Sequence, residues 1–262
     1  MNKKIILQYL LLTFSIMIFL WGLLLIFGYL GFSIDSHFLL YIPWILGGLS
    51  PTIASYIVLK NNNEITGFVE WIKKLFAFKI SIKSYIFTIL LYLVIPIMYF
   101  LIPPGVERIE PIYVFFVFLP IMIIGGGLEE AGWRYILQPE LDKIFGFILS
   151  AIIVAPIWAV WHLPLFYIQG VGQYGTNFGI FTIRIIGYTF ALGAIQKITG
   201  SVFLCILFHS MFNAGLNTFI ITQTLSRNII MSISMVVISI VSVFYIKRKE
   251  RNPSVNAEGI QL

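Results

Sequence analysis

The chain has 262 residues, of which 59% are hydrophobic and only 11% are charged. A soluble domain has about 25% charged residues, so this composition excludes an ordinary soluble globular protein and indicates a chain surrounded by lipid. The formal charge of +6 does not indicate nucleic-acid binding, because the charges flank the apolar runs and form no basic stripe.

Eight apolar runs are long enough, or nearly long enough, to span a bilayer. We therefore predict an all-α polytopic membrane protein, a bundle of about eight transmembrane helices. In chain order the runs cover about 5–30, 38–59, 84–102, 112–138, 146–166, 180–197, 201–222 and 228–246.

The basic residues between these runs predict the orientation. With the N-terminus placed in the cytoplasm, 14 Lys and Arg residues fall on the cytoplasmic side and only Arg108, Arg184 and Arg227 on the outer side. Cytoplasmic loops carry the excess of positive charge, so both termini are expected to be cytoplasmic. The composition, rich in Ile, Lys and Asn, is typical of a bacterial chain, and we expect a multi-pass protein of the plasma membrane.

Three parts follow from this pattern. Residues 1–110 hold N-terminal transmembrane helices and a cytoplasmic amphipathic loop helix at about 62–78, where apolar residues recur at helical spacing opposite Glu and Lys. Residues 111–222 carry the polar motifs described next. Residues 223–262 hold the last transmembrane helix and a short basic cytoplasmic tail, which we expect to be disordered from Asn252 on.

Few ionisable groups lie inside the apolar runs, and a charged group there is costly unless it is paired or hydrated. The polar residues in question are Glu129, Glu130, Arg134, His162, His209 and Asn213. His37 is expected in a solvated outer loop, and the single cysteine, Cys205, is expected to be a packing residue.

The fourth run contains two adjacent carboxylates. Glu130 and Arg134 are four residues apart and share a helix face, so Arg134 can neutralise Glu130 and extend its head toward the cytoplasm. Glu129 points about 100° away on a helix and is therefore a candidate general base. The glycines at 125–127 allow another helix or a peptide to approach closely. The alternative is that these acids mark the end of the span.

His162 lies one helical turn after Trp158, which places an indole beside the imidazole. At 1.5 Å per residue, His162 lies about 10 Å further along its helix than Glu129 along its own. Tilt, a late helix start or a kink at Pro156 must absorb this difference if the two are to meet. The alternative is a histidine of the outer interface in a Trp-rich belt.

His209 and Asn213 are four residues apart in the seventh run, so both point the same way. Two polar groups on one face require polar partners across the bundle. The alternative is a pair of helix–helix hydrogen bonds without chemistry. Six polar residues from three runs nevertheless favour one common site.

Three motifs, in order, resemble the CAAX prenyl protease/bacteriocin-processing family of intramembrane proteases (CPBP, or Abi). They are EEAGWR at 129–134, WAVWH at 158–162 and HSMFN at 209–213. The resemblance covers roughly residues 110–220 and identifies 111–222 as the catalytic core. Trp158 stands where many members carry Phe, and Tyr135 stands where Gly commonly follows the Arg.

The resemblance implies an intramembrane endopeptidase. Glu129 and His162 would activate a water, and His209 and Asn213 would stabilise the oxyanion. Glu130 and Arg134 would hold the first carboxylate in place, with Trp158 as a further supporting residue.

The family is commonly described as metalloproteases, and a zinc site needs about three ligands with an open position. Glu129, His162 and His209 are the candidate zinc ligands. A metal-free glutamate mechanism is equally consistent, since no HExxH motif is present. No cofactor follows from the sequence with certainty.

The expected partners are the lipid bilayer and a peptide or membrane-anchored protein substrate, such as a bacteriocin precursor, a signalling peptide or a lipidated chain; no nucleic acid is expected. Two further functions stay open: a non-catalytic bacteriocin-immunity or scaffold protein, and a proton-linked transporter that uses Glu129 and the histidines as a relay. The sequence does not specify the oligomeric state.

Overall fold

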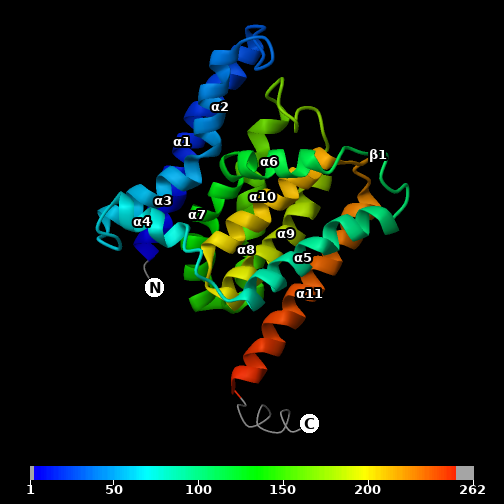
Figure 1. The fold of residues 1–262 in the computed structure, drawn as a ribbon. Coiled ribbons are helices and arrows are strands. Elements are labelled where there is room, and N and C mark those ends of the chain that lie inside the picture. The colour runs from blue at the N-terminus through cyan, green and yellow to red at the C-terminus, as the bar shows by residue number, and fades with distance from the viewer. Residues whose placement is uncertain (1–2, 252–262) are drawn as a thin grey trace.

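The structure is a computed structural model, and it describes residues 3–251. Most of the described chain is helical (Figure 1). The helices are α1 (Lys3–Tyr29), α2 (Tyr41–Gly48), α3 (Ser50–Asn61), α4 (Phe68–Leu75), α5 (Ile82–Leu101), α6 (Tyr113–Ile124), α7 (Glu130–Gly132), α8 (Gln138–His162), α9 (Phe178–Thr199), α10 (Val202–Thr218) and α11 (Leu225–Arg251).

Short elements complete the described chain. They are the 3₁₀ turns η1 (Phe38–Leu40), η2 (Gly127–Glu129) and η4 (Leu163–Phe166), the π-helical turn η3 (Trp133–Leu137), and the strands β1 (Arg108–Ile109) and β2 (Phe219–Ile220). The two strands pair antiparallel and join the loop after α5 to the loop after α10.

The all-α membrane architecture is confirmed. Five helical stretches in the described chain are long and apolar enough to cross a membrane, and a sixth results if the bent pair Phe38–Gly48 and Ser50–Asn61 counts as one span. One of the five, Tyr113–Phe166, covers two of the predicted runs, and α10 is a shorter apolar helix. The predicted total of eight therefore stays a prediction.

The fourth predicted run is not one continuous helix. Within 112–138 the chain forms α6, then η2 and α7, and then η3. Gly126 and Gly127 lie at the break, which places the acidic motif on irregular backbone in the middle of the protein. Irregular backbone at membrane depth is tolerated where it is buried in protein, and Glu130 to Arg134 are all buried.

Polar caps and glycine set several helix ends. The side chains of Ser81, Asn177 and Ser201 accept hydrogen bonds from the first turns of α5, α9 and α10. Gly200 ends α9 in the left-handed conformation, at φ +66°. Each of these ends is set by a residue type that is unfavourable in the interior of a helix and favourable at its ends.

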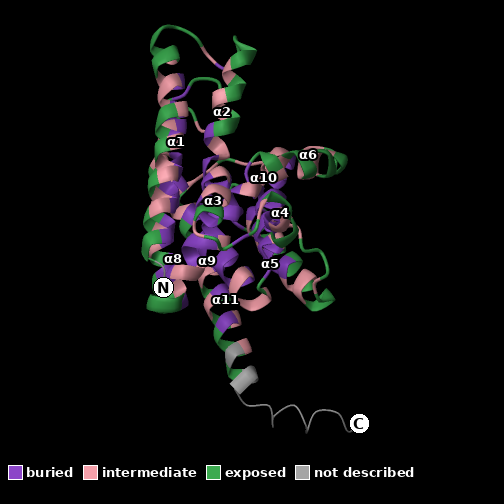
Figure 2. Cartoon of the chain, turned by 90° about the vertical axis from the view of Figure 1, so that its left-hand side faces the viewer, coloured by how far each residue is buried: buried purple, intermediate pink, exposed green. Residues whose placement is uncertain are grey.

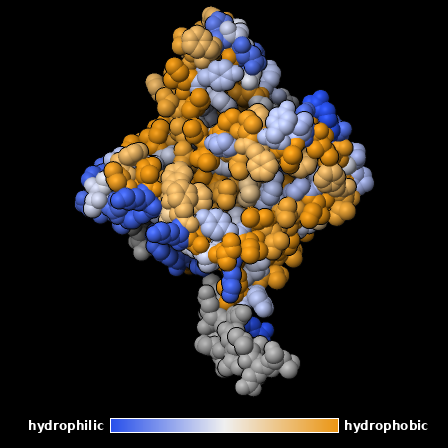
Figure 3. Space-filling model, viewed as in Figure 1, coloured by the Kyte–Doolittle hydropathy of each residue, from blue (hydrophilic) through white to orange (hydrophobic). Residues whose placement is uncertain are grey.

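The buried residues gather where α8, α9 and α10 meet, and the outer faces carry exposed apolar side chains (Figures 2 and 3). This distribution is the one expected of helices that face lipid. The beginning of α1 and the end of α11 lie toward the same side of the molecule (Figure 1), as the prediction of two cytoplasmic ends requires. Which side is cytoplasmic stays a prediction.

The predicted amphipathic helix at 62–78 is present in shorter form as α4. Trp71 and Leu75 are buried, whereas Phe68 and Val69 are exposed. Lys74 forms an ion pair with Glu70 at 2.7 Å. The tail from Asn252 on lies outside the described residues, so its expected disorder is not tested.

Candidate active site

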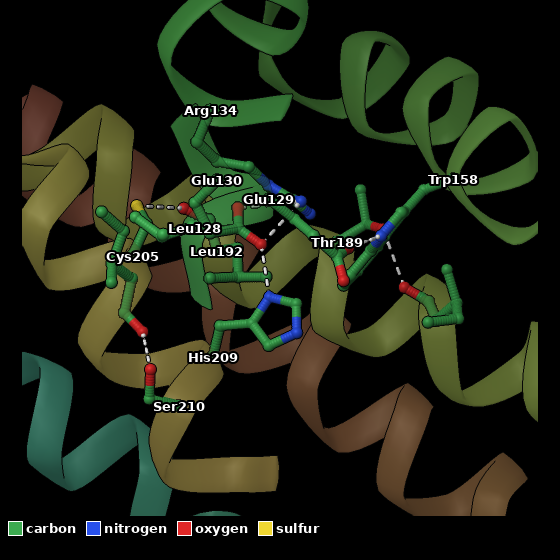
Figure 4. A network of polar contacts seen from close by, with 12 residues as sticks. Leu128, Glu129, Glu130, Arg134, Trp158, Thr189, Leu192, Cys205, His209 and Ser210 are labelled. Carbon is green, nitrogen blue, oxygen red and sulfur yellow. Dashed lines mark hydrogen bonds and ion pairs between the residues drawn. The ribbon is translucent and has the colours of Figure 1, made fainter. Parts of the chain in front are cut away.

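The six polar residues predicted from the apolar runs come together in the protein interior. Glu129, Glu130 and Arg134 lie on the broken segment η2–α7–η3, Trp158 and His162 on the last turns of α8, and His209 and Asn213 on α10. Figure 4 shows the carboxylates, Arg134, Trp158 and His209 facing one another. The alternatives of an interface histidine and of acids at a span end do not describe this arrangement, since these side chains are buried.

Trp158 is the centre of the cluster. Its indole Nε1 donates a hydrogen bond to Oε2 of Glu129 at 2.8 Å. Its ring contacts His162 and His209, with ring centroids 5.7 and 5.6 Å apart, and the guanidinium of Arg134 lies 4.6 Å from its centroid. One side chain therefore touches a carboxylate, both imidazoles and the buried cation.

Glu130 and Arg134 form an ion pair at 3.0 Å, and neither side chain is exposed to solvent. The prediction that the two residues pair is confirmed. The expectation that Arg134 extends its head toward the cytoplasm is wrong, because the guanidinium lies over Trp158 instead. A buried charge requires such partners, since removing it from water is expensive.

The partner of the second carboxylate also differs from the expectation. Oε1 of Glu130 lies 2.6 Å from Nδ1 of His209, so the Glu130–Arg134 pair orients a histidine, whereas Glu129 is held by Trp158. Because Glu130 accepts at Nδ1, Nε2 of His209 is directed away toward the rest of the site.

His162 is held in a definite tautomer. Its Nδ1 lies 2.8 Å from the carbonyl oxygen of Trp158, which can only accept, so Nδ1 carries the proton. In the neutral ring, Nε2 is then left as a base. Backbone breaks allow this helix to reach the site: α8 has a non-helical residue at Gly146 and contains Pro156.

His209 and Asn213 face the backbone of Gly126. A Cβ atom added at Gly126 would lie 2.4 Å from Nδ2 of Asn213 and 2.8 Å from Nε2 of His209. At Gly127 it would lie 2.4 Å from Oγ of Ser210. The prediction that this glycine run permits close approach of another helix is therefore confirmed, and two polar nitrogens meet beside one glycine.

The side chains show little exposure but are not all sealed. Glu129 and His162 are each 7% exposed, whereas Glu130 and Arg134 are 0% exposed. The two residues expected to activate water are thus more accessible than the buried ion pair. His209 interacts electrostatically with both of them.

The residues do not form a ready metal site. No group of three His, Cys, Asp or Glu side chains that could hold a metal ion exists between residues 3 and 251. Glu129, His162 and His209 are the candidate ligands, and in this arrangement they do not converge as a zinc site requires.

No pattern in the sequence marked the supporting residues of the N-terminal helices. Tyr9 of α1 is fully buried and packs edge-to-face on Trp133, with centroids 5.7 Å apart. A Cβ at Gly132 would lie 2.1 Å from its hydroxyl oxygen. Thr52 of α3 donates to the carbonyl of Leu128 at 2.7 Å. These residues hold the acidic segment from the side opposite to α10.

Comparisons with known proteins agree with the motifs. Residues 111–215 match the family model of Rce1-like type II CAAX prenyl endopeptidases. A curated relative, CAAX prenyl protease 2 of Methanococcus maripaludis, is 25% identical over 118 residues. The similarity covers 40% of this chain and 43% of the relative, so the chain matches less than half of that protein's length.

Proposed function

We propose that this chain is an intramembrane endopeptidase which hydrolyses a peptide bond by an activated water. Residues 111–215, which match the family model of Rce1-like CAAX prenyl endopeptidases, form its catalytic core. The substrate is a membrane-proximal peptide or a lipidated protein, by analogy with a relative that is called a CAAX prenyl protease. The observation that carries the proposal is the contact of Trp158 with Glu129, His162, His209 and Arg134 at once.

Glu129 and His162 are the groups that take the proton from water. Glu129 has one oxygen fixed by Trp158, and His162 has Nδ1 fixed by a carbonyl, so each presents a defined second atom. A positioned general base accelerates such a step by about 10²- to 10⁴-fold. Both side chains are slightly exposed, at 7% each, whereas Glu130 and Arg134 are 0% exposed.

His209 and Asn213 stabilise the negative charge that develops on the carbonyl oxygen. Nδ2 of Asn213 is a donor, and Nε2 of His209 is a donor when the ring is protonated beside Glu130. Both nitrogens face Gly126. Donors fixed before the reaction cost no reorganisation when the charge appears. Glu130 and Arg134 act through His209 as positioning residues.

The test is cleavage by the full chain reconstituted in liposomes, with a peptide library that includes S-farnesylated peptides and mass-spectrometric detection of products. We expect Glu129→Gln to lower the cleavage rate by at least about 10²-fold, as for loss of a general base. Thermal unfolding of the variant should stay close to that of the wild type. His37→Gln is the matched control, because His37 lies in an exposed loop.

Full activity of Glu129→Gln would exclude the proposed role of Glu129. Protection against a bacteriocin that survives loss of Glu129, His162 and His209, without any cleavage, would favour the immunity or scaffold function instead. Uptake into proteoliposomes driven by a pH gradient would favour the transporter.

Metal removal tests the chemistry separately. Since the candidate ligands do not converge, we propose a metal-free mechanism, and cleavage should survive dialysis against a chelator within a factor of about two. Elemental analysis of the same sample provides the control. Loss of activity on dialysis, restored by zinc alone, would contradict this part of the proposal.

A further inference from the structure

Three hydrogen-bond donors gather between α5 and α9, outside the residues used above. Arg184 and Tyr188 lie one turn apart on α9, and Tyr99 lies near the end of α5. Arg184 is half-buried, and it interacts electrostatically with both tyrosines. We call Tyr99, Arg184 and Tyr188 the donor cluster.

The donor cluster has no carboxylate partner in the part of the chain that the structure describes. Tyr99 is 2% and Tyr188 1% exposed; their hydroxyls interact with each other and have no other hydrogen-bond partner there. Arg184 lies over the ring of Phe181, 5.5 Å from its centroid, and pairs with no carboxylate among those residues. Buried polar groups in native proteins are nearly always hydrogen-bonded, so a guanidinium without a carboxylate beside two phenols that share one hydrogen bond needs an explanation.

The surroundings of the donor cluster are positive. Arg227 of α11 interacts electrostatically with Tyr99 and is fully buried. Its two terminal nitrogens donate to the carbonyl oxygens of Ile102, Gly105 and Thr222. These neutral acceptors leave its charge in place, and its Nε has no partner among residues 3–251. A region with two guanidinium groups and two phenols but no carboxylate partner favours a bound anion.

Each end of the donor cluster lies one aromatic ring away from a histidine of the candidate active site. The ring of Phe181 lies between Arg184 and His162, at 5.0 Å from the imidazole centroid. The ring of Phe212 stacks on Tyr188 at 4.2 Å and on His209 at 4.5 Å. An extended peptide advances about 3.3–3.6 Å per residue, so an anion held here belongs within a few residues of the bond at the histidines.

The geometry points to the donor cluster as a subsite that binds the C-terminal carboxylate of the peptide substrate. This inference rests on the proposed endopeptidase function and names the group by which the substrate is anchored. The planar guanidinium of Arg184 suits a carboxylate, with two parallel N–H···O bonds available. The two phenols supply further donors. Every linear peptide with a free C-terminus carries a carboxylate there. A substrate cleaved within a few residues of its C-terminus therefore places this carboxylate at the donor cluster.

The test compares an acid with its amide, using N-acetylleucine and N-acetylleucinamide as probes. The purified full chain in a non-ionic detergent is heated with each probe, and unfolding is followed by tryptophan fluorescence. We expect the acid to raise the unfolding midpoint and the amide to leave it unchanged, because a ligand that binds only the folded state stabilises it. The apparent affinity for the acid should fall at least about 10-fold in Arg184→Gln and in Tyr99→Phe/Tyr188→Phe.

Arg108→Gln is the matched control, because Arg108 is exposed and forms an ion pair with Glu110; it should retain the full effect of the acid. Equal effects of acid and amide on the wild type, or an undiminished effect in Arg184→Gln, would overturn the assignment. The assignment also fails if phosphatidylglycerol, and not N-acetylleucine, stabilises the protein through Arg184, since the cluster would then bind a lipid phosphate.

The same measurement in the Glu129→Gln background separates this inference from the proposed function. Binding of the acid in that variant requires no catalysis. If Glu129→Gln keeps both the Arg184-dependent binding and the full cleavage rate, the proposed mechanism is wrong and the subsite assignment still holds. With a cleavable peptide, Arg184→Gln should raise KM for the free acid and leave kcat, and the kinetics of the C-terminal amide, unchanged.

Discussion

Two glutamate–cation pairs in this molecule have the same spacing in the sequence and opposite surroundings. Glu130 and Arg134 are four residues apart and wholly buried, whereas Glu70 and Lys74, also four apart, lie on α4 with side chains 33% and 42% exposed. The buried pair also contacts His209 and Trp158. Spacing alone predicts that such residues meet, but only the tertiary surroundings decide whether the pair is needed for the fold.

Removing one partner of each pair should give the largest contrast. Arg134→Gln leaves Glu130 buried without its cation, and breaking a buried pair in this way costs about 3–5 kcal/mol. Lys74→Gln leaves Glu70 at the surface, where water replaces the lost partner. Thermal unfolding in detergent measures both. Equal stability of Arg134→Gln and the wild type would show that the pair is not needed in the interior.

A smaller contrast concerns two buried indole donors. Trp158→Phe keeps a ring beside the histidines but removes the donor to Glu129. A hydrogen bond to a charged group contributes about 1.5–3 kcal/mol, so cleavage should slow by about 10- to 100-fold. Trp71→Phe is the matched control, because Trp71 donates to Ser55 at 3.2 Å beneath α4; its cleavage rate should not change. Equal losses in the two variants would indicate a general packing effect.

The smallest effect is expected at Glu70 itself. Hydrogen bonds from Lys74 and Thr66 lower the pKa of Glu70 from about 4.5 to about 2. Because the folded-state pKa is the lower one, the stabilisation is present above the ordinary value and is lost as the pH falls toward 2. Glu70→Gln should therefore be slightly less stable than the wild type at neutral pH. The difference should shrink as the pH falls from about 4.5 to 2, and a constant difference would contradict this origin.

The sequence predicted which residues meet better than it predicted how they bond. Isolated polar groups in apolar runs are so costly that Glu129, His162 and His209 could be selected from their positions alone. Their partners could not, because Trp158 lies 29 residues from Glu129, and His209 lies 79 residues from Glu130. Local spacing carries no information on contacts at that separation.

The fold shows the same limit. Hydropathy located the helices, since apolar length determines whether a segment can span the membrane. It did not predict the break of 112–138 into α6, η2, α7 and η3, because the break depends on close packing of Gly126 and Gly127 against α10. Tyr9 was missed for a related reason, since a tyrosine in an apolar run has no pattern that distinguishes a supporting residue from a packing one.

The central claim, that Glu129 activates water inside this buried cluster, is tested most directly by isotope labelling. A single turnover with excess enzyme in H₂¹⁸O should place ¹⁸O in the new carboxyl group of the product and none in Glu129, and Glu129→Gln should give neither product nor label. Label in the Glu129 carboxyl group, or product formed equally well by Glu129→Gln, would contradict the account.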